Sequence, residues 1–485
     1  MQVDLERPTI AGIAHPFRVI GRQEAVRHSA DMSEGAQALA RLCNARSVAI
    51  VGASPDPTKF GYATLHSIME GGYTGNIYPV NPKAGEILGL KAYPSVAEVP
   101  GDIDLLIICI PAAAVPGVLC DAAKKGVRSV LIHSGGYREA GHPELEEELL
   151  RIAKEAGMRI LGPNLQGIIN VPNKLCAIFW PVVKTLGPIG IVSQSGSVTG
   201  GLLDWAEEEG MGISAAINLG NQIDLCESDA IDYLAEDQHT KCIAMYLEGP
   251  REGRRFLQAV RRAAQRKPVT ILKVGRTPGG QAAAASHTGA LAGNDEVFSA
   301  VCEQFGIVRA QDLNSLWDCA KGLATLRNLK GNRVVVLTTS GGGGGLAVDE
   351  LEHCGLVVPR LPSEVVDRLR QCDLPAYASL KNPVDVAGVN TGHFERAALI
   401  LNEFDIADVY LIVFADPVPG GAEAVKRIAA SVRAPVAVAY FSGGALERPE
   451  RAAMHASGIP VFATPERAAR GIAAAVWDAA HRPRS

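Results

Sequence analysis

The chain has 485 residues, which at ~150 residues per domain predicts about three domains. Hydrophobic residues make up 47% and charged residues 20%, so each domain can bury a core, and disorder of most of the chain is excluded. The formal net charge of −5 indicates no basic surface, and we expect no nucleic-acid partner. The 10 cysteines form no C-x-x-C pair, so we predict neither a zinc ribbon nor another metal site.

The first residues give no sign of a targeting segment. Residues 1–7 carry acidic side chains where a signal peptide has a cationic region. No stretch reaches ~18 apolar residues, so we expect no membrane partner and a cytoplasmic setting. Residues 1–38 have weak periodicity and are predicted to form an N-terminal extension.

From residue 47 onward, short apolar runs alternate with helical segments. The expected strands cover 47–51, 77–80, 105–110 and 129–133. Helices are expected near 61–71, 112–125 and 142–156. Strands that alternate with helices predict an α/β fold with parallel sheets and helices on both faces.

Two later segments resemble each other. Residues 189–196 and 334–341 are both apolar strands that end in Ser-Gly and continue into a helix-like segment. Their spacing is about one domain, so we expect two related α/β units. The predicted domains are 1–38 for the extension, 39–174 for the first unit, 175–328 for the second and 329–485 for the third.

The turn at 52–61 joins the first strand to a helix, an arrangement whose exposed amides attract anions. It lacks the G-x-G-x-x-G fingerprint, and the second strand ends in Asn81-Pro82-Lys83, where an NAD site has an acidic residue. Lys83 suits a phosphate on the ribose, which coenzyme A and NADP both carry. The alternative is a purely structural turn with a solvated Lys83. The candidate cofactor-binding residues are Gly52, Ala53, Ser54, Lys59, Asn81 and Lys83.

Two further turns, 193–199 and 338–345, can present amides and hydroxyls to an anion at a helix N-terminus. The five glycines at 341–345 weaken a helix start by up to ~1 kcal/mol each, a cost that is understandable if something approaches the backbone closely. The alternative is an ordinary glycine-rich turn. The candidate phosphate-binding residues are Ser195, Gly196, Ser197, Ser340, Gly341 and Gly342.

His287 lies in a segment of small residues, 279–293. A neutral imidazole can act as a nucleophile, although a lone histidine is more often a surface or core residue. Glu248 ends the apolar run 243–247, at the carboxyl end of an expected strand, where open α/β sheets bind ligands. A carboxylate there can fix the tautomer of an imidazole; the alternative is a surface glutamate at a helix start.

Taken together, these residues resemble the α subunit of the NDP-forming acyl-CoA synthetases, the family of ADP-forming acetate–CoA ligase. Succinyl-CoA ligase α subunits are more distant relatives. Residues 286–293 read S-H-T-G-A-L-A-G and match the family's phosphohistidine motif at all eight positions. The resemblance covers about 38–475 and also includes the motifs at 48–54, 192–196, 219–221 and 382–385.

This resemblance implies a Rossmann-like CoA-binding domain followed by two flavodoxin-like, doubly wound α/β domains. It implies that His287 is phosphorylated, that Glu248 supports it and that Asn164 lies near coenzyme A. The implied reaction is carboxylic acid + CoA + ATP ⇌ acyl-CoA + ADP + phosphate, with a small carboxylic acid as substrate. The family's ATP-grasp domain is missing from the sequence, so we expect ATP, ADP and Mg²⁺ on a separate ATP-grasp β subunit within an oligomer.

The sequence departs from the family at two places. Leu165 stands where the family often has cysteine, so we expect a different thiol placement or acyl preference, and Asn218 replaces a usual serine. Short aliphatic, aryl and dicarboxylic acids all occur as substrates in the family. Two alternatives stay open: a non-catalytic CoA-binding regulatory or scaffold protein, and an NADP-dependent oxidoreductase, for which no glycine fingerprint or hydride-transfer site is found.

Overall fold

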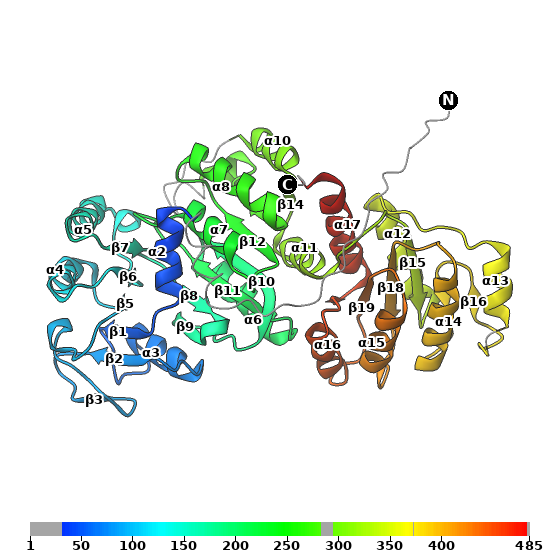
Figure 1. Cartoon of the computed structure of the whole chain (residues 1–485), viewed down its shortest axis with the longest axis horizontal. Coiled ribbons are helices and arrows are strands. Elements are labelled where there is room, and N and C mark those ends of the chain that lie inside the picture. Colours follow the sequence, from blue (N-terminus) through cyan, green and yellow to red (C-terminus); the bar gives the residue numbers. More distant parts are fainter. Residues whose placement is uncertain (1–31, 283–293, 372, 483–485) are drawn as a thin grey trace.

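The computed structural model describes residues 32–282, 294–371 and 373–482, which form three α/β units that follow one another along the long axis of the molecule (Figure 1). Each unit contains one main sheet with helices packed against it. Strands of these sheets are almost wholly buried apolar runs, as expected where helices cover both faces of a parallel sheet. The predicted fold class, a series of doubly wound α/β domains, is confirmed.

The first unit has a five-stranded parallel sheet in the order β2-β1-β5-β6-β7. Its strands are β1 (Ser47–Val51), β2 (Asn76–Val80), β5 (Leu105–Ile108), β6 (Ser129–Ile132) and β7 (Arg159–Leu161). A small hairpin pairs β3 (Glu86–Ile87) with β4 (Leu90–Lys91). Its helices are α3 (Phe60–Glu70), α4 (Val115–Lys125) and α5 (Pro143–Ala156), with short 3-10 turns η1 (Val96–Glu98), η2 (Ala112–Ala114) and η3 (Arg138–Ala140).

Helix α2 (Glu34–Cys43) precedes this sheet and begins inside the predicted extension 1–38. The Ser33 hydroxyl caps it by accepting a hydrogen bond from the Ala36 amide, a capping residue type that stabilises a helix by ~1 kcal/mol. Leu39 and Leu42 on its apolar face are fully buried against residues of both the first and the second unit. Residues 32–38 are therefore part of the packed structure, and residues 1–31 lie outside the described part.

The second unit has a seven-stranded sheet in the order β14-β13-β12-β10-β11-β8-β9. Its strands are β8 (Gly167–Asn170), β9 (Leu175–Ile178), β10 (Leu186–Ser193), β11 (Ile213–Asn218), β12 (Cys242–Leu247), β13 (Val269–Lys273) and β14 (Val308–Ala310). Its helices are α6 (Gly196–Glu208), α7 (Glu227–Glu236), α8 (Gly253–Arg266), α10 (Asp295–Phe305) and α11 (Leu313–Thr325), with the turn η4 (Val171–Asn173). The antiparallel hairpin β8–β9 forms one edge. The boundary predicted at 174/175 falls inside that hairpin, and the domain limits stay a prediction.

The third unit has a six-stranded sheet in the order β16-β17-β15-β18-β19-β20. Its strands are β15 (Val334–Thr338), β16 (Ser379–Leu380), β17 (Val384–Asp385), β18 (Val409–Phe414), β19 (Val436–Tyr440) and β20 (Val461–Phe462). Its helices are α12 (Gly341–His353), α13 (Ser363–Arg370), α14 (Thr391–Glu403), α15 (Gly421–Ser431), α16 (Glu447–Ala456) and α17 (Pro465–His481). The β10–α6 and β15–α12 segments occupy equivalent places in their sheets, in agreement with the predicted relation between units two and three.

In each of the three sheets, the first parallel strand in the chain lies between the next two: β1 between β2 and β5, β10 between β11 and β12, and β15 between β17 and β18. The central neighbours are β1 and β5 in the first unit, β10 and β12 in the second, and β15 and β18 in the third. In such sheets the connections leave these two strands in opposite directions, and ligands bind at the carboxyl ends where they diverge. The topology therefore marks three places, at the ends of β1, β10 and β15.

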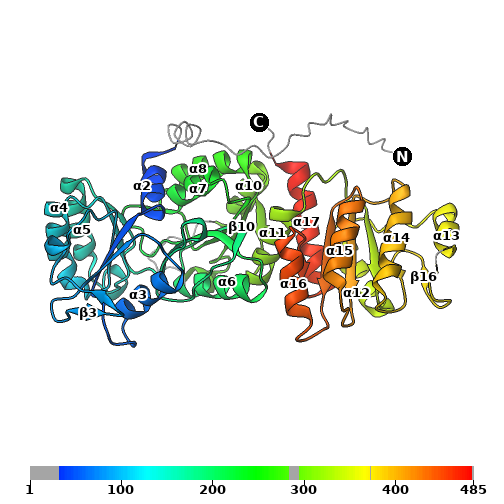
Figure 2. The ribbon, with the colours of Figure 1, turned by 60° about the horizontal axis from the view of Figure 1, so that its bottom comes forward.

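Helix α17 of the third unit packs along α11 of the second, as Figures 1 and 2 show from two directions. Lys321 of α11 is fully buried there, with its ammonium 2.8 Å from a Glu209 carboxylate oxygen. Beside it, the Arg467 guanidinium donates to the Asp318 carboxylate at 2.7 and 2.8 Å. These paired charges satisfy one another in the contact between the two units, where an unpaired charge would be costly.

None of the helices among the described residues is long and apolar enough to cross a membrane. Nor do their histidine, cysteine and acidic side chains gather into a group that could hold a metal ion.

Candidate functional site

The turn after β1 lies at the point where β1 and β5 diverge. Gly52 has φ 85°, and a side chain there would meet the Cys109 carbonyl oxygen at 2.6 Å. A side chain on Gly61, in the first turn of α3, would overlap the Gly52 carbonyl oxygen. Two glycines thus allow the turn and the start of the helix to lie in contact at the sheet edge.

Asn81 brings the end of β2 onto this turn. Its side-chain amide donates to the Ala53 carbonyl at 2.8 Å, and its side-chain oxygen accepts from the Lys83 amide at 2.8 Å. The Lys83 side chain is exposed beside the turn, and Lys59 is exposed just before α3. Within the turn, the Ser54 hydroxyl accepts from the Asp56 amide at 3.0 Å. The structure therefore brings the six cofactor-binding candidates of this turn together.

Asn164 follows β7 at the same edge of the first sheet. Its backbone takes φ 59°, and its amide donates to the Ser134 carbonyl at 2.9 Å. Its side chain donates to the Asn221 side-chain oxygen at 3.2 Å, across to the second unit. Asn164 is thus placed at the border of the two units, on the edge that carries the β1 turn.

The second turn, Ser193 to Gly196, lies at the carboxyl end of β10. Ser195 caps α6: its hydroxyl accepts from the Val198 amide at 3.4 Å and lies 3.2 Å from the Ser197 hydroxyl. Ser195 is buried, Gly196 half-buried and Ser197 exposed. Hydroxyls and free helical amides therefore meet at the N-terminus of α6, where the helix dipole favours an anion.

Gln194 joins this turn to Glu248. Its side-chain oxygen accepts from the backbone amides of Glu248 and Gly249, and its side-chain amide donates to the Gly249 carbonyl at 2.8 Å. Glu248 is 3% exposed and follows β12, the neighbour of β10. Burial, and next the nearby Glu248 charge, raise the pKa of Tyr246 to about 12. The predicted anion turn and the predicted carboxylate therefore lie side by side.

His287 lies outside the described residues. The chain on its N-terminal side leaves β13, where Lys273 pairs with Leu247 of β12 directly before Glu248. After the undescribed stretch, the chain re-enters helix α10 at Asp295, whose N-terminus is capped by the Asn294 side chain. The end of β13 thus lies one strand away from Glu248, and the described chain continues through helical residues 278–282 before the undescribed stretch.

The third turn is held within its own sheet. The Ser340 amide donates to the Thr338 hydroxyl at 3.1 Å, and the Thr339 hydroxyl accepts from the Ala415 amide at 3.0 Å. Helix α12 begins at Gly341, so the five glycines form its first turn and a half. A side chain on Gly341 would meet an Asp385 carboxylate oxygen at 3.5 Å, which puts a negative charge beside this helix start. An anion there would have to compete with that carboxylate.

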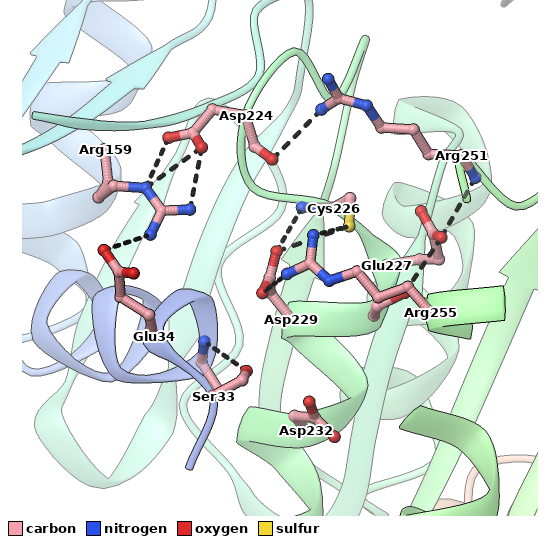
Figure 3. A network of polar contacts seen from close by, with 12 residues as sticks. Ser33, Glu34, Arg159, Asp224, Cys226, Glu227, Asp229, Asp232, Arg251 and Arg255 are labelled. Carbon is pink, nitrogen blue, oxygen red and sulfur yellow. Dashed lines mark hydrogen bonds and ion pairs between the residues drawn. The ribbon is translucent and has the colours of Figure 1, made fainter. Parts of the chain in front are cut away.

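A network of charged side chains holds the loop after β11 against the first unit (Figure 3). Asp224 in that loop accepts from the Arg159 guanidinium at 2.9 Å and from the Ile160 amide at 2.8 Å, both in β7. Glu34 of α2 lies 3.8 Å from the same arginine. A bidentate pair of this kind fixes orientation as well as position.

The same network reaches the loop after β12 (Figure 3). The Arg251 amide donates to the Glu227 carboxylate at 3.2 Å, and its guanidinium donates to the Asp224 carbonyl at 3.2 Å. Glu227 is fully buried, and burial raises the pKa of its carboxyl group. Arg251 follows Glu248 by three residues, so the loop that carries Glu248 is held by Gln194 on one side and by this network on the other.

Gln194, Asp224 and Glu227 are not among the site residues predicted from the sequence. Each acts through a partner on another strand or loop, and that partner is known only once the strands are paired. The one usable signal was the position of Gln194 between two serines at a strand end.

Known proteins match the chain over almost its whole described length. Residues 46–171 match the family described as "CoA binding domain", and residues 186–323 match "Succinyl-CoA ligase like flavodoxin domain". The α subunit of acetate–CoA ligase [ADP-forming] I from Pyrococcus furiosus is 36% identical, over 92% of this chain and 99% of that protein. Acetate–CoA ligase [ADP-forming] I from Archaeoglobus fulgidus is also 36% identical, over 89% of this chain but 62% of that protein.

Among solved structures, the acetyl-coenzyme A synthetase 1 of Candidatus Korarchaeum cryptofilum, in complex with phosphate and ADP, aligns with a TM-score of 0.81. It is 33% identical and covers 92% of this chain and 97% of its own. The two matched family models and the similarity over most of the chain define an α/β protein of the CoA-ligase class. The chain belongs to the family of ADP-forming acyl-CoA synthetases and is similar to their α subunits.

Proposed function

We propose that the chain is the CoA-binding, phosphohistidine-carrying subunit of an ADP-forming acyl-CoA synthetase. The observation that carries the proposal is the contact between Gln194 and the backbone of Glu248, because it joins an anion-binding helix start to a buried carboxylate. The proposed nucleophile is the imidazole of His287, on the grounds of family membership and of the motif around this residue. The three together suit transfer of a phosphoryl group to histidine.

The reaction proceeds in three steps. Phosphate attacks the thioester carbon of acyl-CoA, which releases CoA and leaves an acyl phosphate. The imidazole of His287 attacks phosphorus, and the carboxylic acid leaves. The phosphohistidine then passes its phosphoryl group to ADP, which gives ATP; the reverse order makes acyl-CoA.

Each candidate residue has a defined part in these steps. The Glu248 carboxylate accepts a hydrogen bond from one imidazole nitrogen and offsets the positive charge that develops on the ring. The amides and hydroxyls of Ser195, Gly196 and Ser197 receive the phosphoryl oxygens at the N-terminus of α6. Because these donors are already in place before reaction, no reorganisation is needed at the transition state.

The first unit fits coenzyme A. Gly52 and Gly61 let the β1 turn and the N-terminus of α3 lie in contact, and Asn81 places Lys83 beside them. A lysine at the end of β2 is suited to the phosphate on the CoA ribose. Asn164, at the border with the second unit, would lie towards the thiol end of the cofactor.

ATP, ADP and Mg²⁺ bind on a separate ATP-grasp subunit in this proposal. Its support is that the matched relatives include proteins named as α subunits, one of which the chain covers to 99%.

The test is reconstitution with an ATP-grasp subunit of this family. The purified chain alone should bind CoA, measured by calorimetry, but release no ADP from ATP, acid and CoA. The mixture should form acyl-CoA and ADP in equal amounts. A chain that binds CoA but stays inactive with every acid and partner supports the regulatory or scaffold alternative instead, and full turnover by the single chain would contradict the proposal.

A further inference from the structure

A set of aromatic and polar side chains lies between the two turns assigned to coenzyme A and phosphate. Phe60 begins α3 directly after the β1 turn, and its ring centre lies 4.7 Å from that of Phe179 at the end of β9. Phe179 in turn lies 5.5 Å from the His133 ring, in an edge-on arrangement. The His133 imidazole is 3.1 Å from the Leu165 carbonyl oxygen, and Gln166 is the next residue.

Gln166 completes the path to the phosphate turn. Its backbone amide donates to the Asn218 side-chain oxygen at 2.6 Å, and the Asn218 side chain donates to the Ser193 carbonyl at 2.9 Å. Its side-chain oxygen is 3.8 Å from the point where a side chain on Gly196 would begin. A thioester held between the two turns therefore has its acyl group next to this set of residues.

Two of these side chains present aromatic surface to solvent. Phe60 is 59% exposed and Trp180, which follows Phe179, is 56% exposed. The Trp180 ring rests on α6, where a side chain on Gly200 would meet it at 3.1 Å. Single exposed apolar side chains are common on protein surfaces. Two exposed aromatic rings near the β1 turn and the N-terminus of α6 form a surface on which a flat apolar group can pack.

The same place holds two buried acceptors without a partner among the described residues. His133 donates its Nδ1 hydrogen to the Leu165 carbonyl, which can only accept, so Nε2 of the neutral ring is a bare acceptor. Burial lowers the pKa of His133 to about 4, which keeps the ring neutral. The second acceptor is the side-chain oxygen of Gln166, whose amide group donates to the Trp180 carbonyl.

Buried polar atoms without partners are uncommon, and here both atoms are hydrogen-bond acceptors. They are suited to a hydrogen-bond donor on a ligand and are unsuited to a second carboxylate, whose oxygens also carry lone pairs. A hydroxyl group can donate its one hydrogen to either of them, whereas the second carboxylate of a dicarboxylic acid has no hydrogen to donate.

We propose that Phe60, His133, Gln166, Phe179 and Trp180 form the acyl subsite, and that it takes an aromatic monocarboxylic acid with a hydroxyl substituent. This inference rests on the proposed function, because that function places the thioester between the two turns. The methyl group of acetate would neither cover the aromatic surface nor donate a hydrogen bond to either acceptor. Leu165, at the position where the family often has cysteine, is buried, and its carbonyl oxygen is the partner of His133 Nδ1.

The test is calorimetric titration of the full chain with three ligands: acetyl-CoA, phenylacetyl-CoA and 4-hydroxyphenylacetyl-CoA. Phenylacetyl-CoA should bind ~10-fold more tightly than acetyl-CoA, as expected for one aromatic contact, and the hydroxyl should add a further ~3- to 10-fold. Phe60→Leu should remove most of the aromatic preference, measured as the ratio of phenylacetyl-CoA affinity to acetyl-CoA affinity. The control is Tyr377→Leu, which removes a 79% exposed aromatic ring from the third unit and should change none of the three affinities.

Equal affinity for the three ligands would overturn the inference and leave the proposed function intact, whereas failure to bind CoA itself would contradict both. Because Phe60→Leu alters a residue that is 59% exposed, we expect it to fold, and a thermal melt beside the unsubstituted chain checks this. If Phe60→Leu instead weakens assembly with the ATP-grasp subunit and leaves the acyl preference unchanged, the exposed ring belongs to a subunit contact and the inference is wrong. The unsubstituted chain with its three ligands decides the question even if a variant fails to fold.

Discussion

At the scale of single residues, the account depends on Glu248 more than on any other described side chain. It is buried at the carboxyl end of β12 and its backbone is fixed by Gln194. The sequence was sufficient to select Glu248 and Ser195, because both end apolar runs and such ends meet at one sheet edge. It was not sufficient to select Gln194, whose role depends on the pairing of β10 with β12.

Glu248→Gln should leave histidine phosphorylation measurable but slow. The amide can still accept a hydrogen bond from the imidazole, but it cannot offset the charge that develops on the ring. We expect a loss of ~2–4 kcal/mol in transition-state stabilisation, the size found for preorganised electrostatic partners. The measurement is the single-turnover rate of phosphoryl transfer in the reconstituted complex. Glu252→Gln, an exposed change four residues further on, is the control, and an unchanged rate in Glu248→Gln would remove Glu248 from the mechanism.

Lys83→Glu should weaken the binding of CoA more than that of dephospho-CoA. The attraction between a lysine and a phosphate ~4 Å away near a surface is of order a few kcal/mol before screening, and it is absent for the ligand without that phosphate. Calorimetric titration at low and high salt measures the difference. Lys154→Glu makes the same charge change on α5 and should affect both ligands little. An equal loss for both ligands with Lys83→Glu would show that this lysine does not contact the ribose phosphate.

At the scale of elements, alternation of strands and helices was enough to predict the order of most of the first unit. The structure begins α3 at Phe60 and ends it at Glu70, against an expected helix near 61–71. Pairing between distant segments was not predictable. The hairpin β8–β9 joins the second sheet because β8 pairs with β11, and nothing local to residues 167–178 encodes that partner. The glycine run was expected to weaken a helix start, yet it forms the first turns of α12, where Gly343 and Gly344 let Val413 and Pro383 approach closely.

Gly61→Ala tests the contact between the β1 turn and α3. An added methyl group would overlap the Gly52 carbonyl, so the turn or the helix must move, and the proposed CoA-binding turn changes its shape. We expect CoA affinity to fall by ~10-fold or more, as for the loss of one or two well-placed hydrogen bonds. The measurement is titration with CoA, together with a thermal melt to show that the unit stays folded.

Gly117→Ala is the matched control for that change. Gly117 lies in α4 of the same unit, and an added methyl group there meets nothing within 4 Å. Alanine favours a helix over glycine by up to ~1 kcal/mol, so this variant should be as stable as the unsubstituted chain or more so. CoA affinity that falls equally in both variants would argue against a specific role for the turn.

At the scale of the whole molecule, the units are joined through buried contacts that include charges. Arg159 and Asp224 link the first unit to the second, and Lys321 with Glu209 lies where the second meets the third. Composition and spacing predicted three units, but not which faces meet, because these contacts pair residues that lie far apart in the sequence.

Asp478 of α17 provides a test of this packing that depends on pH. Burial, opposed by Arg482 and Arg327, raises the pKa of its carboxyl group to about 6, against 3.8 when unperturbed. Between these values the folded chain binds more protons than the unfolded chain, so this group lowers stability as pH rises from about 4 to about 6. Asp478→Asn should therefore raise the melting temperature by a few degrees at pH 7.5, with the difference lost near pH 4.

The measurement is a thermal melt of both proteins at several pH values. Asp367→Asn, an exposed change on α13, is the control and should shift the melting temperature little at any pH. A difference between Asp478→Asn and the parent chain that does not depend on pH would show that the Asp478 carboxyl group does not titrate in this range.

The most direct test of the central claim is to find the phosphoryl group on the chain. The chain is mixed with an ATP-grasp subunit of the family and γ-labelled ATP, and acid-labile, base-stable phosphate is located by peptide mapping. The account predicts one labelled site, His287, which disappears in His287→Asn and remains in His142→Asn, a change of an exposed histidine in the first unit. Label that His287→Asn acquires at the rate of the unsubstituted chain would contradict the account at its centre.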